Sequence, residues 1–239
     1  MAKGRDIGRR HGDKPHNGYT SQGGTVSPVL ANIYLHYALD MWFEEVVKRH
    51  CHGVCYICRY ADDFVCAFQY KDDAEWFYNA LGIRLKEFGL EVAEDKTTMM
   101  CFSRLHMEDK NSFEFLGFEF RWGNNRAGYA QLQKRTSRKK LRNSLVNFND
   151  WCKKNRNHRL RDLFKELNAK LRGYYNYYGV RGNYKSLRQY FFQAVLFKWV
   201  NRRSHMKSYN WEGFKEILKY YGIARSRITE KKQLQLKMF

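Results

Sequence analysis

The sequence predicts an α+β fold in which a mixed first half is followed by a helical, basic second half. Up to about residue 120, short apolar runs typical of strands alternate with helical apolar stripes, and beyond it the helical stripes prevail. Charge divides at the same place. Residues 1–120 hold 14 Lys+Arg and 18 Asp+Glu, whereas residues 121–239 hold 30 Lys+Arg and 6 Asp+Glu. Such asymmetry favours two functional units.

The overall composition indicates a folded protein whose partner is a polyanion. The 239 residues carry a net charge of +20, and a hydrophobic content of 44% is too high for a disordered chain. No long apolar run occurs, at the start or elsewhere, so we expect neither a signal peptide nor a membrane helix. A basic surface that only aids solubility is the alternative, which self-repulsion in the second half disfavours.

The first helix is expected after a polar start. Residues 1–20 are rich in Gly, His, Asn and charge, which predicts a loop. Ser27 and Pro28 then predict an N-cap and a first helical residue. The apolar face expected of this helix consists of Leu30, Ile33, Tyr34, Tyr37, Ala38 and Met41.

Two apolar runs, residues 54–60 and 64–68, predict a β-hairpin with acidic residues at its tip. Cys55 and Cys58 form a Cys-x-x-Cys in the first run, a spacing found in zinc sites. Because residues three apart on a strand face opposite sides, we do not expect these thiols to share a metal. Without a secretory signal, all six cysteines are interpreted as reduced thiols.

A second helix and further strands complete the first half. Asp72 or Asp73 is expected to cap a helix that ends at Gly89. Its apolar face comprises Phe77, Leu81, Leu85 and Phe88. Residues 91–102 predict strand and turn, and residues 113–120 predict one strand with a glycine-marked kink.

The second half predicts four basic helices after a Gly- and Asn-rich break at residues 123–128. Residues 187–200 are apolar nearly all round, which is typical of a buried helix. The other three helices carry the stripes Leu141, Leu145, Phe148 and Trp151; Leu160, Leu163, Phe164, Leu167 and Leu171; and Trp211, Phe214, Leu218 and Tyr221.

The segment Arg59-Tyr60-Ala61-Asp62-Asp63-Phe64 carries the sharpest chemical signal. Two adjacent carboxylates between apolar strands repel each other unless a cation neutralises them, and Mg²⁺ takes oxygen ligands. Asp is also common in plain turns. The motif alone therefore leaves a metal site and an acidic turn equally open.

A glycine-rich loop upstream, Ser21-Gln22-Gly23-Gly24-Thr25, allows a ligand to approach the backbone closely before the first helix. Together with Tyr60-Ala61-Asp62-Asp63, this loop resembles the reverse transcriptases of group II introns, which double as maturases. The resemblance covers about residues 18–205. It continues through Gly89-Leu90-Glu91 with Glu94-Asp95-Lys96-Thr97, through Phe115-Leu116-Gly117-Phe118, and through Leu171-Arg172-Gly173-Tyr174-Tyr175-Asn176-Tyr177-Tyr178-Gly179.

The resemblance implies an RNA-directed DNA polymerase that works by two-metal nucleotidyl transfer. Asp62 and Asp63 match the catalytic acidic pair, which holds two Mg²⁺ ions, with Mn²⁺ as an expected substitute. Lys96 matches a lysine near the phosphates of the dNTP, with a plain surface lysine as the alternative. The loop lining the incoming nucleotide and template is matched by Gln22, Gly23 and Gly24. The segment that steadies the primer end is matched by Phe115, Leu116, Gly117 and Phe118.

The helical half resembles the thumb, also called the X or maturase domain, which holds the primer–template duplex and the group II intron RNA. Arg and Lys interleave with aromatic residues in the segment 170–190, and cations bind phosphates. The tyrosines either stack on bases or pack the bundle, and packing is favoured. The basic residues expected to contact phosphates are Lys134, Arg135, Arg138, Lys139, Lys140 and Arg172.

The expected architecture is a partial polymerase palm, an antiparallel sheet with helices, followed by an all-α basic thumb or maturase bundle. The expected boundaries are 1–20 for an N-terminal loop or truncated start, 21–122 for the palm, 129–222 for the helical domain and 223–239 for a basic tail. We expect a cytoplasmic, nucleoid- or RNA-associated bacterial protein, with an organellar location as the alternative.

The family needs a third metal-binding aspartate on a palm strand well before the Gln-Gly-Gly loop. The upstream aspartates, Asp6 and Asp13, do not lie in apolar strand-like runs. The fingers and the front of the palm have no counterpart, and Ser21 replaces the proline usual in the loop. We therefore expect a truncated or split reverse transcriptase that cannot polymerise DNA alone. A second polypeptide would supply the fingers and the first palm aspartate.

Two further interpretations stay open. One is a maturase-like RNA-binding protein whose acidic pair is residual, and the other is a defective gene fragment. Loss of cDNA synthesis on substitution of the acidic pair, in a complemented complex, separates the enzyme from the binding protein. A cooperative melt argues against the fragment. A bacterial defence reverse transcriptase fits less well, since the second half resembles a maturase.

Overall fold

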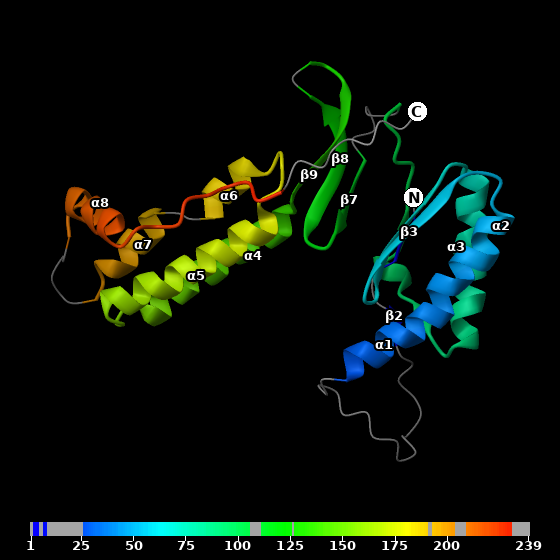
Figure 1. The fold of residues 1–239 in the computed structure, drawn as a ribbon, viewed down its shortest axis with the longest axis horizontal. Coiled ribbons are helices and arrows are strands. Elements are labelled where there is room, and N and C mark those ends of the chain that lie inside the picture. The colour runs from blue at the N-terminus through cyan, green and yellow to red at the C-terminus, as the bar shows by residue number, and fades with distance from the viewer. Residues whose placement is uncertain are drawn as a thin grey trace, which may run out of the picture. The chain divides into compact units, whose positions relative to one another are not determined.

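The computed structural model describes residues 2–4, 7–8, 26–105, 111–125, 127–190, 193–203 and 209–230 (Figure 1). The chain divides into two compact units, Met1–Asn111 and Ser112–Phe239. This division by contacts falls earlier than the expected break at residues 123–128, because the strands that follow Asn111 pack with the second unit. No helix in the described part of the chain is long and apolar enough to cross a membrane.

A four-stranded antiparallel sheet is the base of the first unit. In spatial order its strands are β3 (Cys55–Tyr60), β4 (Asp63–Phe68), β1 (Ala2–Gly4) and β6 (Thr98–Met99). A separate antiparallel pair joins β2 (Ile7–Gly8) to β5 (Glu91–Val92). The loop predicted for residues 1–20 is thus wrong at β1 and β2. The strand β1 pairs with β4 through backbone N–H and C=O groups, so β1 itself does not need an apolar side-chain pattern.

A continuous helix runs from Ser27 to His50. Its described parts are α1 (Ser27–Leu35), the π-helical segments η1 (His36–Asp40) and η2 (Phe43–Val47), and α2 (Lys48–His50). The N-cap prediction is wrong by one position. The carbonyl of Val26 accepts the first bonds, from the amides of Val29 and Leu30 at 3.0 Å each, so Ser27 is already helical.

The buried face of this helix differs from the predicted one. The predicted residues Leu30, Ile33, Tyr34 and Tyr37 are about half exposed, although Ala38 is buried. The buried face consists instead of Leu35, Leu39, Phe43 and Val47, together with Ala38. These leucine, phenylalanine and valine residues are spaced by four. A π turn, closed by i→i+5 bonds, contains more residues than an α turn, so a four-residue spacing stays in line on one side.

The helix α3 (Lys71–Glu87) packs against the sheet and the long helix. Phe77, Leu81 and Leu85 are buried as predicted, and Gly89, at φ +64°, ends the helix as predicted. The capping prediction is wrong, since Tyr70 occupies the N-cap. Asp73 lies in the first turn and accepts instead from the amides of His52 and Gly53, both at 3.1 Å. Burial raises the pKa of Asp73, but these bonds outweigh it and lower the pKa below its ordinary value.

The second unit begins with a three-stranded antiparallel meander of β7 (Ser112–Phe115), β8 (Phe118–Asn124) and β9 (Ala130–Thr136). An all-α bundle is therefore wrong for this unit, and the single kinked strand at residues 113–120 is a hairpin. Leu116 and Gly117, at φ 49° and 78°, form the left-handed pair that a type I′ turn requires. β9 was missed because its sequence, Ala-Gln-Leu-Gln-Lys-Arg-Thr, is mostly polar.

Helices form the rest of the second unit. They are α4 (Arg138–Asn155), α5 (Leu160–Tyr178), α6 (Tyr184–Tyr190), α7 (Gln193–Val200) and α8 (Trp211–Tyr220). The predicted stripes supply most of the core, which includes Phe148, Leu163, Leu167, Leu171, Phe214 and Leu218. The buried helix predicted for residues 187–200 is replaced by parts of α6 and α7. Gln193, Ala194 and Lys198 on α7 are exposed, so α7 buries one face only.

Candidate active site and nucleic-acid interface

The acidic pair lies at the tip of a tight hairpin, as predicted. Tyr60 and Asp63 are the last paired residues of β3 and β4, which leaves Ala61 and Asp62 as a two-residue loop. Ala61 has a φ of 54°, a left-handed conformation that costs a non-glycine residue about 1–2 kcal/mol. Asp62 is exposed and Asp63 is half-buried. The hairpin thus presents two adjacent carboxylates on a short, ordered support.

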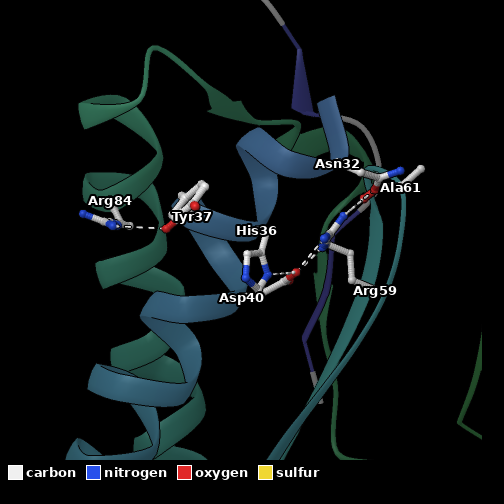
Figure 2. A network of polar contacts seen from close by, with 7 residues as sticks. All are labelled: Asn32, His36, Tyr37, Asp40, Arg59, Ala61 and Arg84. Carbon is white, nitrogen blue, oxygen red and sulfur yellow. Dashed lines mark hydrogen bonds and ion pairs between the residues drawn. The ribbon is translucent and has the colours of Figure 1, made fainter. Parts of the chain in front are cut away.

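Arg59 ties this tip to the long helix (Figure 2). Its Nε and Nη2 donate to the two carboxylate oxygens of Asp40 at 2.7 and 2.5 Å. Its Nη1 donates at 2.9 Å to Asn32 Oδ1 and at 2.9 Å to the carbonyl of Ala61, the first loop residue. One side chain therefore connects η1, α1 and the hairpin loop, and its contact with Ala61 holds the strained residue beside Asp62.

The electrostatics of this clamp favour the ionised forms. Burial alone raises the pKa of Asp40, but the hydrogen bonds and charge of Arg59, with a smaller contribution from His36, lower it below its ordinary value. Its bond to Asp40 raises the pKa of Arg59. The segment η1 is held from its other side as well, since Arg84 of α3 donates to the carbonyl of Tyr37 at 3.4 Å (Figure 2). It also donates to the carbonyl of Ala38 at 3.2 Å.

The residues present at the tip fit a divalent cation. Asp62 and Asp63 offer carboxylate oxygens, the donors that hard cations such as Mg²⁺ and Mn²⁺ prefer. The hydrogen bonds of Arg59 go to Asp40, Asn32 and Ala61 rather than to the acidic pair. In the described part of the chain, no group of three or more His, Cys, Asp or Glu is placed to hold a metal.

The cysteine pair is arranged as the strand prediction required. Cys55 is buried beneath the sheet and Cys58 is exposed on the other side of β3. All six cysteines carry free thiols. Burial raises the pKa of the Cys66 thiol well above its ordinary value, so this cysteine is a core residue and not a nucleophile.

Of the residues predicted to bind nucleotide or template, only Lys96 lies in the described part of the chain. Gln22, Gly23 and Gly24 lie outside the described residues. Lys96 is exposed and ends the 3₁₀ turn η3 (Glu94–Lys96), just before β6. Lys96 precedes β6, whereas the acidic pair joins β3 to β4, and β1 lies between β4 and β6 in the sheet. A role of Lys96 at nucleotide phosphates stays a prediction.

The segment predicted to steady a primer is anchored on α5. The hydroxyl of Tyr177 donates to the carbonyl of Leu116 at 2.9 Å, and the Ser137 amide donates to the carbonyl of Gly117 at 3.0 Å. The Phe118 ring lies 5.6 Å from that of Tyr177. Phe115 and Phe118 are buried. Leu116 and Gly117 are half-buried, so the turn keeps some accessible surface, whereas the two phenylalanines pack.

The predicted phosphate contacts fall in three places of the second unit. Lys134 and Arg135 lie on β9, where they form ion pairs with Glu230 at 3.3 Å and Glu119 at 2.7 Å. Both line a pocket of about 820 Å³. Its other charged residues are Arg121, Arg181, Lys185 and Glu230.

Arg138, Lys139 and Lys140 form the exposed first turn of α4. Cations there oppose the positive end of the helix dipole at a cost of about 0.3–1 kcal/mol each, so they do not serve helix stability. Arg172 is exposed on α5 and lines a second, larger pocket. All three places are consistent with binding of phosphate groups.

Sequence reasoning missed several residues that the fold brings to these pockets. The basic and aromatic segment 170–190 predicts phosphate binding in general, but within it the sequence does not single out Arg181, Lys185 and Arg188. Arg121, Lys219 and Arg225 gave no signal, because isolated basic residues are common on any surface.

Residues 7–120 match the family described as "Reverse transcriptase (RNA-dependent DNA polymerase)". No curated protein matches the chain. The matched segment contains the hairpin with Asp62 and Asp63, the clamp of Arg59 and the turn at Leu116 and Gly117. Residues 7–120 are therefore similar to the reverse transcriptase (RNA-dependent DNA polymerase) family.

Proposed function

We propose that this chain is a group II intron-type reverse transcriptase and maturase, with two-metal nucleotidyl transfer at Asp62 and Asp63. The observation that carries the proposal is the placement of both carboxylates at the tip of one hairpin within the matched segment, Asp62 in the two-residue loop and Asp63 at the start of β4. A plain acidic turn does not need the clamp of Arg59, which reaches 19 and 27 residues back to the helix.

Bound at these carboxylates, Mg²⁺ would neutralise triphosphate charge and activate the primer hydroxyl. The residues of the chain position the reaction. Arg59 fixes the backbone at Ala61, which sets the direction in which Asp62 leaves the loop. Because Asp40 compensates the charge of Arg59, the guanidinium does not compete with a cation for the acidic pair.

The second unit is proposed to hold the primer–template duplex, the RNA template and the intron RNA. Support comes from its surplus of cations and from the pocket beside β9, in which four basic residues other than Arg135 surround one carboxylate. A maturase-like protein with a residual acidic pair uses the same surface. It is therefore the second candidate function.

Primer extension tests the enzyme. We expect the purified chain with Mg²⁺ and dNTPs to need a polypeptide carrying the fingers and the first palm aspartate. In that complemented complex, Asp62→Asn and Asp63→Asn should each lower cDNA synthesis by about 10²-fold or more, because an amide is a poor cation ligand. Asp72→Asn, an exposed aspartate of α3, is the matched control and should keep full activity.

The outcomes separate the two candidates. Loss of synthesis with unchanged RNA affinity supports the enzyme. Unchanged synthesis in both variants overturns the catalytic role of the pair. Absence of synthesis with any complementing polypeptide, together with tight RNA binding, favours the RNA-binding protein.

A further inference from the structure

The second unit contains a basic and aromatic groove of about 1280 Å³. It is bounded by α5, α6, α7, α8 and the segment 222–226, which runs back along the helices (orange to red in Figure 1). Four cations and three aromatic residues line it: Arg172, Arg188, Lys219, Arg225, Tyr175, Tyr184 and Trp211. We call it the α8 groove.

Among the described residues that line the α8 groove, no carboxylate balances the four cations. The pocket beside β9 differs, since Glu230 lies within it and pairs with Lys134. Elsewhere in the described structure, arginines such as Arg59 and Arg84 are matched by nearby acids. Four cations around one hollow repel each other, so the arrangement favours an anionic ligand with several charges.

Two of the three aromatic residues of the α8 groove offer ring surface, whereas Tyr175 is buried in the core. Trp211 is 39% exposed and Tyr184 is 48% exposed. Trp211 is held at its edge by Phe197, with ring centroids 4.9 Å apart at 80°. A fixed, exposed indole beside cations is a platform on which a base can stack.

The wall of the groove is preformed. Asn168 of α5 accepts from the Ala224 amide at 2.8 Å and donates to the Gly222 carbonyl at 3.0 Å, so one side-chain amide pins the segment that carries Arg225. Asn210 caps α8 through the Gly213 amide at 2.8 Å. A preorganised wall lowers the entropic cost of binding.

We propose that the α8 groove binds an unpaired stretch of polynucleotide, with phosphates at the four cations and a base stacked on Trp211. An acidic peptide would satisfy the cations but leave the aromatic rings without a role. A duplex would supply phosphates to the four cations, but its bases are stacked on one another and cannot stack on Trp211. The inference rests on the proposed nucleic-acid binding of the second unit and is independent of polymerase chemistry.

Fluorescence anisotropy of the full chain with labelled 12-mers tests it, using single-stranded RNA, single-stranded DNA and the RNA duplex. Trp211→Leu should lower single-strand affinity by about 5- to 150-fold, the range of one base–aromatic stack, and Trp211→Tyr should restore most of it. Arg188→Ala with Arg225→Ala should reduce the slope of log affinity against log salt by about 1.4, because each single-strand phosphate contact contributes about 0.7. Whichever single strand binds more tightly identifies the source.

Controls keep the result specific. Arg161→Ala with Lys165→Ala removes two exposed cations of α5 outside the groove and should change the single-strand affinity by less than twofold. Thermal melting of every variant shows whether Trp211→Leu still folds. Arg188→Ala with Arg225→Ala alters exposed side chains only, so it tests the groove even if the tryptophan variant unfolds.

The outcomes are distinct. Loss of single-strand binding with duplex binding intact supports the α8 groove. Equal losses for both ligands, or no loss, overturn it. Polyglutamate that competes as well as RNA, and is unaffected by Trp211→Leu, also overturns it. If the wild-type chain binds neither RNA form, the proposed function of the second unit fails first.

Discussion

Two hairpin turns with left-handed residues, one in each unit, are held in opposite ways. The loop of Ala61 and Asp62 is fixed by a charged network, in which Arg59 bonds to Asp40 and Asn32. The turn of Leu116 and Gly117 is fixed by neutral groups, the Tyr177 hydroxyl and the Ser137 amide. At its turn, the first unit therefore uses a basic side chain in ion pairs and hydrogen bonds within the fold. The second unit leaves many of its basic side chains available to ligands.

The charge of each unit agrees with that contrast. Residues 1–111 hold 14 Lys+Arg and 16 Asp+Glu, and residues 112–239 hold 30 and 8. Where charges balance, an arginine finds a carboxylate and stabilises the fold. Where they do not, cations gather around hollows such as the α8 groove. The difference is consistent with the metal chemistry proposed for the first unit and the polyanion binding proposed for the second.

The charged clamp gives the largest expected effect on stability. Arg59→Gln should lower the free energy of unfolding by about 1.5–3 kcal/mol, because it removes charge-assisted hydrogen bonds from a partly buried carboxylate. Arg59→Lys is the matched control and should lose less, since it keeps the charge but not the paired geometry. Urea unfolding of both variants measures the difference.

The same variant has a predicted pH dependence. Because the pKa of Asp40 is lowered in the folded state, its ionised form stabilises the fold at every pH above the ordinary pKa of Asp. This stabilisation is lost as the pH falls through the lowered pKa. The difference between wild type and Arg59→Gln should be full at pH 7 and shrink below about pH 4. If the difference in the free energy of unfolding between wild type and Arg59→Gln stays constant down to pH 2, the loop at Ala61 is not held by charge, which contradicts the account.

The turn at Leu116 and Gly117, which is held by neutral groups, gives the matching test in the second unit. Gly117→Ala should destabilise by about 1–2 kcal/mol at any pH, because φ is +78° and the new Cβ would lie 3.1 Å from the Tyr178 hydroxyl. Gly173→Ala in α5, with nothing within 4 Å, should instead stabilise by about 0.5–1 kcal/mol. Thermal melts give both signs, and destabilisation by both alanines would contradict the account.

The smallest effect concerns Glu230, the carboxylate of the pocket beside β9. Burial raises its pKa, but the Arg181 amide and the charges of Lys134 and Arg181 outweigh this and lower it, so the carboxylate remains charged at neutral pH. Glu230→Gln should raise duplex RNA affinity about two- to fivefold, since it frees Lys134. Asp150→Asn on α4 is the control. Unchanged or weaker binding with Glu230→Gln would show that no phosphate competes for this site.

The sequence predicted elements better than contacts. Apolar periodicity identified α3, α5 and the β3–β4 hairpin, and it placed Asp62 and Asp63 at the tip of that hairpin. Their catalytic role stays a prediction. Sequence reasoning missed the partner of Arg59, because Asp40 lies in a different element 19 residues away. It missed the buried face of the long helix, because π turns change the residue spacing. It missed β9, whose polar sequence pairs through its backbone.

A combined metal and RNA titration tests the division of labour most directly. Mn²⁺ binding is followed by electron paramagnetic resonance and RNA binding by anisotropy, on wild type and on Asp62→Asn with Asp63→Asn. The account predicts that Mn²⁺ affinity falls by about tenfold or more, because both carboxylate ligands become amides, while RNA affinity stays within about twofold. Unchanged Mn²⁺ binding, or a parallel fall in RNA affinity, would contradict it.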